Sequence, residues 1–420
     1  MRVRSLLVVG LVAVGVPLAA QNPAYVKRGK IERQGRAWVE RIECGASVRP
    51  GARLRVRADR GSVRVKPGPD NRMECEVRVR AYAANEGEAK RYFSRYELSV
   101  RLLEGAGAYL RGRLRHPPTP TPLTIEFEIK VPRRFNLDLQ TGGGDLIVER
   151  LEGELRAVTA GGDIRTGDVT GPVRAETAGG SIVLGNIGQR VEARTAGGAI
   201  RVGNVNGDAT LETSGGKIHT GRIAGAVRAK TAGGDILLAG AGADIIAQTA
   251  GGQIRIGESG GGVRAQTAGG SINLDAVRGP IRVETAGGSI HLYRVQSAVQ
   301  AATAAGKILA QIAASAENFG ASLLETSFGD VEVYLPPDLP LTIDATIQMA
   351  TGHKILTDFP LTIEGGKASF GPSTLRGHGA LNGGGVVLRI LTTAGNIEIR
   401  KLDASRLKRL PQRQERQPQP

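Results

Sequence analysis

The residues of this sequence that could do chemistry lie mostly in a glycine-rich stretch, and the acidic ones are the first candidates. Asp145 and Asp163 stand at equivalent positions in neighbouring copies of a repeated motif. Two carboxylates at a set separation can hydrolyse a glycosidic bond, one as the acid and the other as nucleophile or base. The next copies of the motif carry Ser181, Ala199 and Lys217 at this position. We therefore interpret the pair as exposed surface, with a catalytic pair as the alternative.

The run from Gly142 to Asp145 raises a second chemistry, calcium binding. The period of the motif is twice that of calcium-binding β-rolls, which need Gly-x-Asp in every nonapeptide. Aspartate occurs in only a few copies of the motif, so we expect no calcium site. Cys44 and Cys75 are the only cysteines, and two cysteines without a clustered histidine do not make a zinc site. The sequence thus predicts no metal, no cofactor and no catalytic residue.

A row of basic side chains is the remaining candidate for ligand binding. These residues lie six positions after the repeated threonine, and Val183, Leu237 and Asn273 interrupt the row. We interpret the row as solvated ladder positions, with contact to an anionic glycan as the alternative. Its members are Arg165, Arg201, His219, Arg255 and His291.

A strict internal repeat must position all of these side chains. The motif Thr-Ala-Gly-Gly-x-Ile, with small variations, recurs at every eighteenth position without a slip. A fixed period of this kind indicates a solenoid in which one repeat is one coil. The repeated threonines are Thr141, Thr159, Thr177, Thr195, Thr213, Thr231, Thr249, Thr267, Thr285 and Thr303.

The residues around each threonine predict strands. Val173 and Ala175 alternate with Arg174 and Glu176, which is the period of two of a half-buried strand. Branched residues five, seven and ten positions after the threonine complete three short apolar segments per coil. At about 4.8 Å per strand, ten coils make a rod of about 48 Å. The expected fold is all-β, a right-handed parallel β-helix with one coil for each copy of the motif.

Paired glycines separate the apolar segments. A tight corner needs either φ > 0 or a backbone too crowded for a Cβ atom, and glycine meets both needs. We therefore expect Gly179→Val to strain a corner and to destabilise the fold by several kcal/mol. The predicted corner glycines are Gly161, Gly162, Gly179, Gly180, Gly197, Gly198, Gly215, Gly216, Gly233, Gly234, Gly251, Gly252, Gly269, Gly270, Gly287 and Gly288.

The first twenty residues have the pattern of a secretory signal peptide. Two early arginines precede an apolar run from Leu6 to Ala20, which is too short and too broken by glycine and proline for a good membrane span. We expect cleavage near residue 20, with an uncleaved anchor as the alternative. The protein is then exported to the periplasm, the outer surface or the extracellular space.

Residues 21–122 predict a basic, mostly-β module that precedes the rod. Residues 21–140 carry 26 Lys and Arg against 14 Asp and Glu, whereas residues 141–400 carry 22 against 24. Leu54 and Val56 alternate with arginines, as expected for a sheet with one solvated face. Because we expect export, an envelope polysaccharide, an anionic lipid or another surface protein is a better partner than nucleic acid.

Two further features of the module can be read from spacing. Cys44 and Cys75 share the parity of the apolar residues in their strands, so an oxidising compartment predicts a disulfide, with two buried thiols as the alternative. Ala89, Phe93 and other apolar residues recur at helical spacing from residue 85 to about 95, which predicts a short helix packed on the sheet.

The period breaks after Thr303. Thr326 begins a decayed copy that comes later than the period requires, and Thr351 and Thr393 begin what we interpret as shortened copies. We expect regular coils over residues 123–310 and irregular rungs with a cap over 311–402, in which bulky residues such as Phe328 shield the core. The tail at residues 403–420, rich in Gln, Pro and Arg, is predicted to be disordered.

Several segments together resemble a known family. The repeat Thr-Ala-Gly-Gly-Ser-Ile, residues 325–331, residues 381–385 and residues 395–399 resemble the bacterial putative-adhesin family of β-strand-repeat proteins of unknown function. The likeness covers about residues 120–402. It implies a right-handed, single-stranded β-helix on an exported protein, and it implies no chemistry.

Repeat and resemblance together predict a non-enzymatic structural or adhesive scaffold at the cell envelope. Two alternatives stay open at this point. One is a carbohydrate-active enzyme, a polysaccharide lyase or hydrolase built on the same rod, and the other is a filament protein that assembles end to end.

Overall fold

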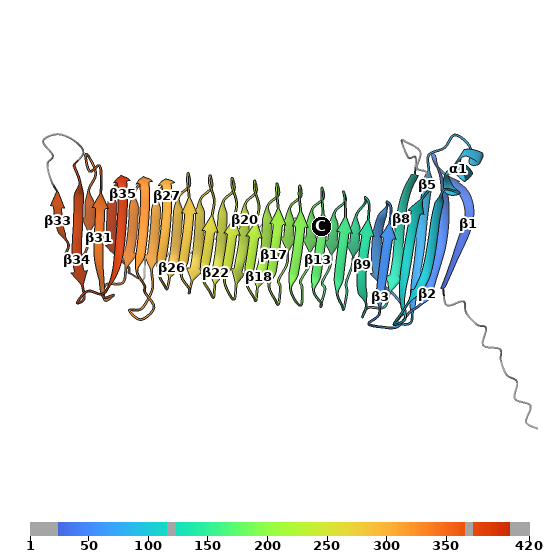
Figure 1. Ribbon diagram of the computed structural model, residues 1–420, viewed down its shortest axis with the longest axis horizontal. Helices are drawn as coiled ribbons and strands as arrows, with labels where there is room; N and C mark the ends of the chain where they lie inside the picture. The colour runs from blue at the N-terminus through green and yellow to red at the C-terminus, as the bar shows by residue number, and fades with distance from the viewer. Residues whose placement is uncertain (1–23, 116–122, 366–372, 404–420) are drawn as a thin grey trace, which may run out of the picture.

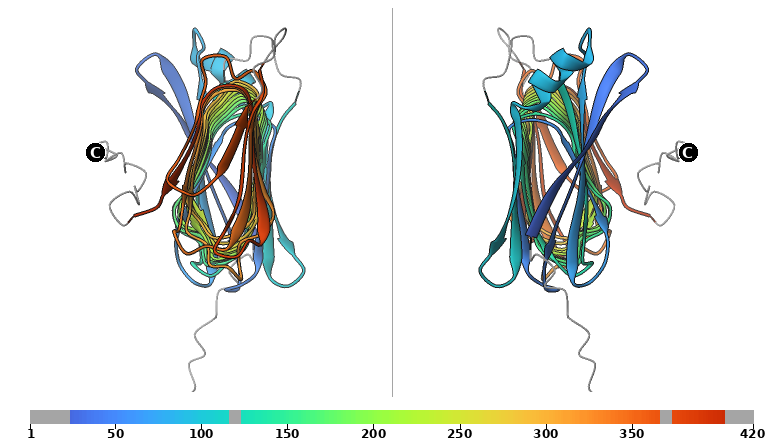
Figure 2. Two further views of the ribbon diagram at one scale, coloured as in Figure 1. Left: turned by 90° about the vertical axis from the view of Figure 1, so that its left-hand side faces the viewer. Right: turned by 90° about the vertical axis from the view of Figure 1, so that its right-hand side faces the viewer.

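The computed structural model describes residues 24–115, 123–365 and 373–403. The expected signal peptide and all but the first residue of the expected tail lie outside these ranges. The chain forms one long rod in which strands stack along the axis in two sheets (Figure 1). Seen from either end, the coils superimpose as a narrow, flattened oval (Figure 2). The predicted parallel β-helix is confirmed.

Sheet A covers one broad face of the rod. In spatial order its strands are β1 (Ala24–Gln34), β2 (Ala37–Ser47), β5 (Arg72–Ala81), β8 (Leu123–Val131), β4 (Ser62–Pro67), β10 (Leu146–Val148), β12 (Ile164–Thr166), β14 (Ile182–Leu184), β16 (Ile200–Val202), β18 (Ile218–Ile223), β20 (Ile236–Ala241), β22 (Ile254–Ser259), β24 (Ile272–Val277), β26 (Ile290–Val295), β28 (Ile308–Ile312), β30 (Val331–Leu335), β36 (Ile397–Lys401) and β32 (Ile355–Thr357).

Sheet B covers the opposite face. In spatial order its strands are β6 (Tyr96–Leu103), β7 (Gly107–Leu114), β3 (Arg53–Ala58), β9 (Asn136–Thr141), β11 (Leu155–Thr159), β13 (Val173–Thr177), β15 (Val191–Thr195), β17 (Ala209–Thr213), β19 (Val227–Lys230), β21 (Ile245–Gln248), β23 (Val263–Gln266), β25 (Ile281–Thr285), β27 (Val299–Ala305), β29 (Ser322–Phe328), β35 (Val386–Ala394), β31 (Leu341–Ile347), β34 (Leu375–Leu381) and β33 (Thr362–Gly365).

Each regular coil contributes one strand to each sheet, and neighbouring coils pair in parallel and in register up to β26, which pairs with β28 with a shift between Leu292 and Val295. Val173 pairs with Val191 in sheet B, and Ile182 pairs with Ile200 in sheet A. Both pairs join equivalent residues of successive copies of the motif. Equivalent side chains therefore lie above one another and form rows along the rod.

The third apolar segment of the coil does not form a sheet of its own. In the first coils it makes single bridges, such as Val169 to Ile187 and Ile187 to Val205. From β18 onward its residue is the last one of a longer sheet A strand, so that Ile223 pairs with Ala241.

The interior is aliphatic, and the repeated threonines line one edge of it. Their exposed fractions lie between 3% and 8%. Thr195 Oγ1 donates a hydrogen bond of 2.8 Å to the carbonyl of Gly180 in the preceding coil, and it accepts one from the Gly198 amide at 3.3 Å. The same two bonds recur from Thr159 through Thr285. They satisfy buried backbone groups at the corner, where the strand ladder ends.

At the N-terminal end, the spatial order of the coils departs from the chain order. The coil of β3 and β4 stacks directly on β9 and β10, while β7 and β8 lie on its outer side. Thr141 Oγ1 donates to the Gly61 carbonyl at 2.9 Å, so the turn between β3 and β4 serves as the preceding corner. Residues 53–67, expected in a separate module, thus form a coil of the rod.

The remaining N-terminal elements cover the end of the core. The predicted helix is confirmed as α1 (Glu86–Phe93), with Asn85 accepting the Glu88 amide as N-cap at 2.9 Å. Ala89 and Phe93 are buried. Strands β1, β2 and β5 pair in antiparallel fashion next to β8, which ends the parallel stack.

At the C-terminal end, a late coil is likewise inserted between earlier ones. The coil of β35 and β36 lies between that of β29 and β30 and that of β31 and β32. Thr326 pairs with Thr303, as its decayed motif predicts. Phe328 is 63% exposed and does not shield the core, because it is the last residue of β29, two positions beyond the buried Thr326, whereas Phe359 is buried.

Two sequence expectations about the last coils are wrong. The ladder threonine of β35 is Thr392, whose Oγ1 donates to the Gly329 carbonyl at 3.1 Å, rather than Thr393. The residue that pairs with Thr392 in β31 is Ile347, and Thr351 lies beyond the strand. The motif fails here because the connections between these coils no longer have a fixed length.

The two glycines of each corner have different roles. A Cβ atom on Gly179 would lie 3.5 Å from the Gly161 carbonyl oxygen, an ordinary contact, whereas one on Gly180 would lie 2.1 Å from that of Gly162. The second glycines from Gly162 to Gly288 all show 2.0 or 2.1 Å. Glycine is therefore necessary at the second position because a Cβ atom there would overlap the preceding coil, and not because the backbone has a positive φ. The expectation that Gly179→Val strains the corner is thus wrong for Gly179, and the strain would arise at Gly180 instead.

We predict that Gly180→Ala lowers the free energy of unfolding by about 3 kcal/mol, because its Cβ overlaps the backbone of the preceding coil. Gly179→Ala is the matched control and should change it by no more than about 0.5 kcal/mol. Urea-unfolding midpoints of the two variants check this. Equal midpoints would show that the corner is not crowded as described.

Candidate functional site

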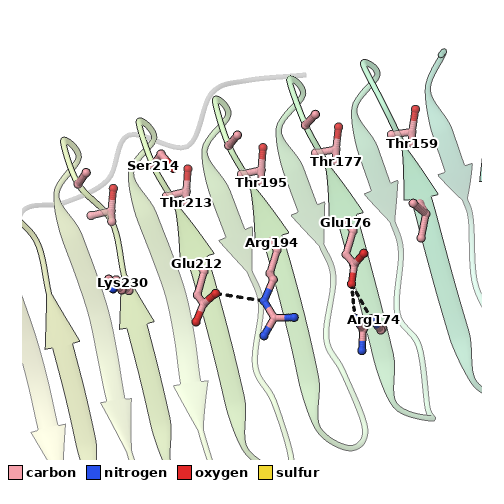
Figure 3. A pocket seen from close by; sticks show the side chains of 15 residues that line it. Thr159, Arg174, Glu176, Thr177, Arg194, Thr195, Glu212, Thr213, Ser214 and Lys230 are labelled. Carbon is pink, nitrogen blue, oxygen red and sulfur yellow. Dashed lines mark hydrogen bonds and ion pairs between the residues drawn. The ribbon is translucent and has the colours of Figure 1, made fainter. Parts of the chain in front are cut away.

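A shallow groove with a volume of about 750 Å³ runs along sheet B, from β11 to β19 (Figure 3). Its floor lies where the strands reach the glycine corners and is made of the threonines and the small residues that follow them, such as Ser214. Its wall is made of charged side chains that point outward from the strands. Because the coils are in register, the groove presents the same floor at every step.

The charged side chains of the wall neutralise one another. Arg174 Nη2 lies 2.5 Å from Glu176 and Nη1 lies 3.4 Å from Glu192, which also contacts Arg194. Arg194 Nε in turn lies 3.1 Å from Glu212. Exposed pairs of this kind stabilise the fold little, but they occupy the carboxylates of the wall.

A carboxyl group with a raised pKa, as a general acid requires, occurs at Glu40, outside the groove. Burial raises the pKa of Glu40, and the guanidinium of Arg28, 2.9 Å away, offsets this only in part. Glu40 is 4% exposed in the N-terminal cap, and Arg28 also bonds the Phe93 and Tyr96 carbonyls. This pair ties β1 and β2 to the end of α1, and its carboxyl group is buried.

Asp145 and Asp163, the candidate catalytic pair, bind backbone. Asp145 Oδ1 accepts the amide of Asp163 at 2.9 Å, and Asp163 Oδ1 accepts the amide of Ser181 at 2.7 Å. Arg165 lies 2.5 Å from Asp163 and 3.6 Å from Asp145. The two carboxylates close corners of neighbouring coils.

The same bond recurs at other corners and is a feature that the sequence analysis missed. An Asp, Asn or Ser side chain accepts the amide of the equivalent residue in the next coil, as from Asp168 to Asn186 and from Asp208 to Ala226. The signal was present in the sequence, as the recurrence of short acceptor side chains directly before the apolar segments.

The basic row, for which an anionic ligand is the alternative interpretation, lies in register on the outer face of sheet A. From β12 to β26 the row reads Arg165, Val183, Arg201, His219, Leu237, Arg255, Asn273 and His291. The apolar residues Val183 and Leu237 interrupt the series of basic side chains. His291 is half-buried with Nδ1 2.8 Å from Asn273 Oδ1, and burial, followed by the charge of Lys307, lowers its pKa.

The predicted cysteine pair forms a disulfide. Cys44 and Cys75 face each other across β2 and β5, with their Cα atoms 4.9 Å apart, and both are buried. Within the three described ranges, no group of three or more His, Cys, Asp or Glu side chains could hold a metal ion. No helix in these ranges is both long and apolar enough to cross a membrane.

Fold and surface together define a class, a long parallel β-helix with a neutralised polar groove. No protein-family model matches the sequence, and no curated protein matches it. Among solved structures, the chain is similar to a putative cell adhesion protein from Clostridium sporogenes at 9% identity, over 86% of this chain and 99% of that one, with a TM-score of 0.15.

It is also similar to a putative adhesin from Bacteroides fragilis at 9% identity, over 70% of this chain and 95% of that one, with a TM-score of 0.20. Both descriptions name adhesion, as does the family that the repeats resemble. At these TM-scores the likenesses carry no argument about this chain.

The corner role of Asp163 predicts a difference between two substitutions. Asp163→Ala should lower the free energy of unfolding by about 1 kcal/mol, because the Ser181 amide loses its acceptor. Asp163→Asn keeps an acceptor oxygen and should stay close to the wild type. Thermal unfolding of both variants is the measurement, and an asparagine variant as unstable as the alanine one would contradict the assignment.

Asp235 predicts a dependence of stability on pH. The Lys217 ammonium, 2.8 Å away, and the Gln253 amide hold the pKa of the Asp235 carboxyl below its ordinary value of 3.8. A lowered pKa stabilises the fold above the ordinary value, and this stabilisation is lost as the pH falls through the lowered one. The stability difference between wild type and Asp235→Asn should therefore be present at neutral pH and shrink below about pH 4. A difference that persists at lower pH would count against it.

Proposed function

We propose that the protein is an exported, non-enzymatic β-helix that serves as a structural or adhesive scaffold at the bacterial cell envelope. The observation that carries this proposal is that acidic side chains along the rod already bind partners within the protein. Glu176 and Glu212 in the groove bind arginines, and Asp145 and Asp163 accept backbone amides. Acid–base hydrolysis of a glycan needs two carboxyl groups directed at a common bond, and these residues are directed at the protein itself.

The shape of the rod supports a scaffold. Two continuous ladders and an unbroken aliphatic core resist bending, because every coil is hydrogen-bonded to both neighbours. Identical positions in successive coils repeat along the axis. Weak contacts to a repetitive polymer can therefore add up through multivalency.

The chemistry of the N-terminal region supports export. Residues 1–20 have the pattern of a secretory signal, and the Cys44–Cys75 disulfide suits an oxidising compartment outside the cytoplasm. The ends of the rod argue against the filament alternative. Antiparallel strands β1 and β2 terminate sheet A at one end, and β34 and β33 terminate sheet B at the other, so a second rod does not continue the parallel pairing.

The test combines fractionation with activity. The full chain, expressed with its first twenty residues, should be found in the envelope or the medium, and the purified protein should co-sediment with isolated envelopes. It should release no reducing ends and no unsaturated sugars from a panel of polysaccharides. Retention in the cytoplasm, absence of sedimentation, or turnover of any polysaccharide would each contradict the proposal.

A further inference from the structure

The N-terminal end of sheet B carries a cluster of arginines that the groove described above does not use. These residues come from β6, β7, β3 and β11, which lie within five adjacent strands of the sheet. We name this cluster the arginine patch, consisting of Arg55, Arg57, Arg101, Tyr109, Arg111 and Arg156.

The register fixes the spacing of the patch. Across the five strands one outward row reads Arg101, Tyr109, Arg55, Asp138 and Arg156. Its arginines thus stand on every second strand, about 9.6 Å apart at about 4.8 Å per strand, and the row spans about 19 Å. Arg111 and Arg57 pair in the neighbouring outward row and broaden the positive surface.

The surface of the arginine patch contains two hollows. One hollow of about 390 Å³ is lined by Arg55, Arg57, Arg101 and Tyr109, and a second of about 790 Å³ by Arg57, Tyr109 and Arg111. The second shares Val158 with the groove along sheet B, so that the two form one continuous path. The half-buried ring of Tyr109 borders both hollows.

Asp138 holds two of the arginines in place. Its Oδ2 atom lies 3.1 Å from Arg55 Nε and 2.7 Å from Arg57 Nη2, and Arg57 also donates to the Asp138 carbonyl at 3.1 Å. Burial by itself would raise the pKa of the Asp138 carboxyl, but the bond to Arg57 and the charges of both arginines outweigh it and lower the pKa. Asp138 therefore remains a carboxylate and keeps both guanidinium groups oriented.

The other arginines of the patch are available to a ligand. Arg101, Arg111 and Arg156 are exposed, and none of them forms a side-chain hydrogen bond or ion pair with a residue in the described ranges. The five guanidinium groups thus outnumber the two carboxylates beside them, Asp138 and Asp59, and Asp59 also accepts the Leu114 amide at 3.0 Å. A surface with this excess charge is complementary to an anionic polymer.

We propose that the arginine patch binds a linear acidic polysaccharide that lies along the rod axis, with an acidic group on every second sugar. A pyranose unit is close in length to one strand spacing, so acidic groups on alternate sugars meet arginines on alternate strands. The guanidinium fork binds a carboxylate or sulfate in bidentate fashion, and the ring of Tyr109 packs against an intervening sugar. This inference rests on the scaffold function, which it deepens by naming the ligand class.

The geometry favours a polysaccharide over two other polyanions. Single-stranded nucleic acid is held by aromatic rings on which successive bases stack, and the patch has one aromatic ring. A lipid headgroup layer is broad and flat, whereas the patch is a path with hollows along one line. Binding of either polyanion is therefore an outcome of the test and not part of the proposal.

The test measures binding of the full chain to hyaluronan oligosaccharides, which carry a carboxylate on alternate sugars, by calorimetry. Affinity should rise with length and level off at about five sugars, one for each strand at about 4.8 Å, and it should fall with added salt. Neutral dextran is the control polymer and should not bind. Affinity that is independent of length and of salt would overturn the proposal.

Two triple variants separate the patch from overall charge. Arg101→Gln, Arg111→Gln and Arg156→Gln together should weaken binding about tenfold or more, because they remove the free guanidinium groups. The matched control Arg228→Gln, Arg264→Gln and Arg278→Gln removes the same charge from exposed positions elsewhere on the rod, outside the basic row of sheet A. Equal losses in both variants would contradict a specific site.

Asp138→Ala distinguishes an oriented site from a diffuse positive surface. The substitution adds net positive charge, so diffuse attraction predicts tighter binding of hyaluronan, whereas loss of the oriented arginines predicts weaker binding. We expect weaker binding, with partial recovery in Asp138→Asn, which keeps an acceptor oxygen. Thermal unfolding confirms that each variant is folded, and tighter binding of the folded alanine variant would overturn the role of Asp138.

The outcomes also separate this inference from the scaffold function. Envelope sedimentation without binding of hyaluronan, or preferential binding of single-stranded DNA or phosphatidylglycerol vesicles, would overturn the patch and leave the scaffold. Hyaluronan binding by a chain that stays in the cytoplasm would support the patch and overturn the envelope location.

Discussion

The structure depends on how closely the backbones of successive coils approach one another at the paired glycines. At Gly180 the carbonyl oxygen of the coil before occupies the place of a Cβ atom. The approach lets Thr195 reach the carbonyl of Gly180, so the buried polar groups at the corner are satisfied. Because the same contact recurs in every regular coil, it fixes the length of the coil and, with it, the register of both sheets.

Because the register is fixed, residues at the same position of successive coils form rows, and the types of residue in a row determine the charge of the surface there. Arginine and glutamate alternate along the wall of the groove and neutralise one another, as Arg194 does with Glu192 and Glu212. Corner carboxylates such as that of Asp163 are used by the amide of the next coil. Many charges of the regular rod are therefore paired, whereas the arginine patch, with its excess of positive charge, lies where other segments join the sheets.

Segments from outside the regular repeats join the two sheets at the ends of the rod. At each end a coil is placed between two others that are not its neighbours in the chain, which interlocks the terminal segments with the regular stack. The antiparallel strands beyond them, α1 and the Cys44–Cys75 disulfide then cover the aliphatic core at the N-terminal end. The arginine patch is a product of this interlocking, because it combines the arginines of β6, β7 and the inserted β3 with Arg156 of the repeats.

The sequence by itself determined the regular part of the fold. The constant period of the motif, the alternation around each threonine and the paired glycines predict the strands, the inward side chains and the corners, because neighbouring coils interact identically and the pattern is local. The predicted helix near residue 85 follows from spacing in the same way. The sequence also placed Asp145, Asp163 and the basic row at equivalent positions, but it could not show that the acids bind backbone, since their partners belong to the next coil.

Only the tertiary structure decided the order of the terminal coils and the composition of the patch. Arg101 and Arg156 lie far apart in the chain, and they share a row because β3 is inserted between β7 and β9. The residues near Thr351 and Thr393 likewise resemble the motif, yet the ladder passes through Ile347 and Thr392. Where connections vary in length, several registers satisfy the local pattern equally well, and the packing of the whole end selects one of them.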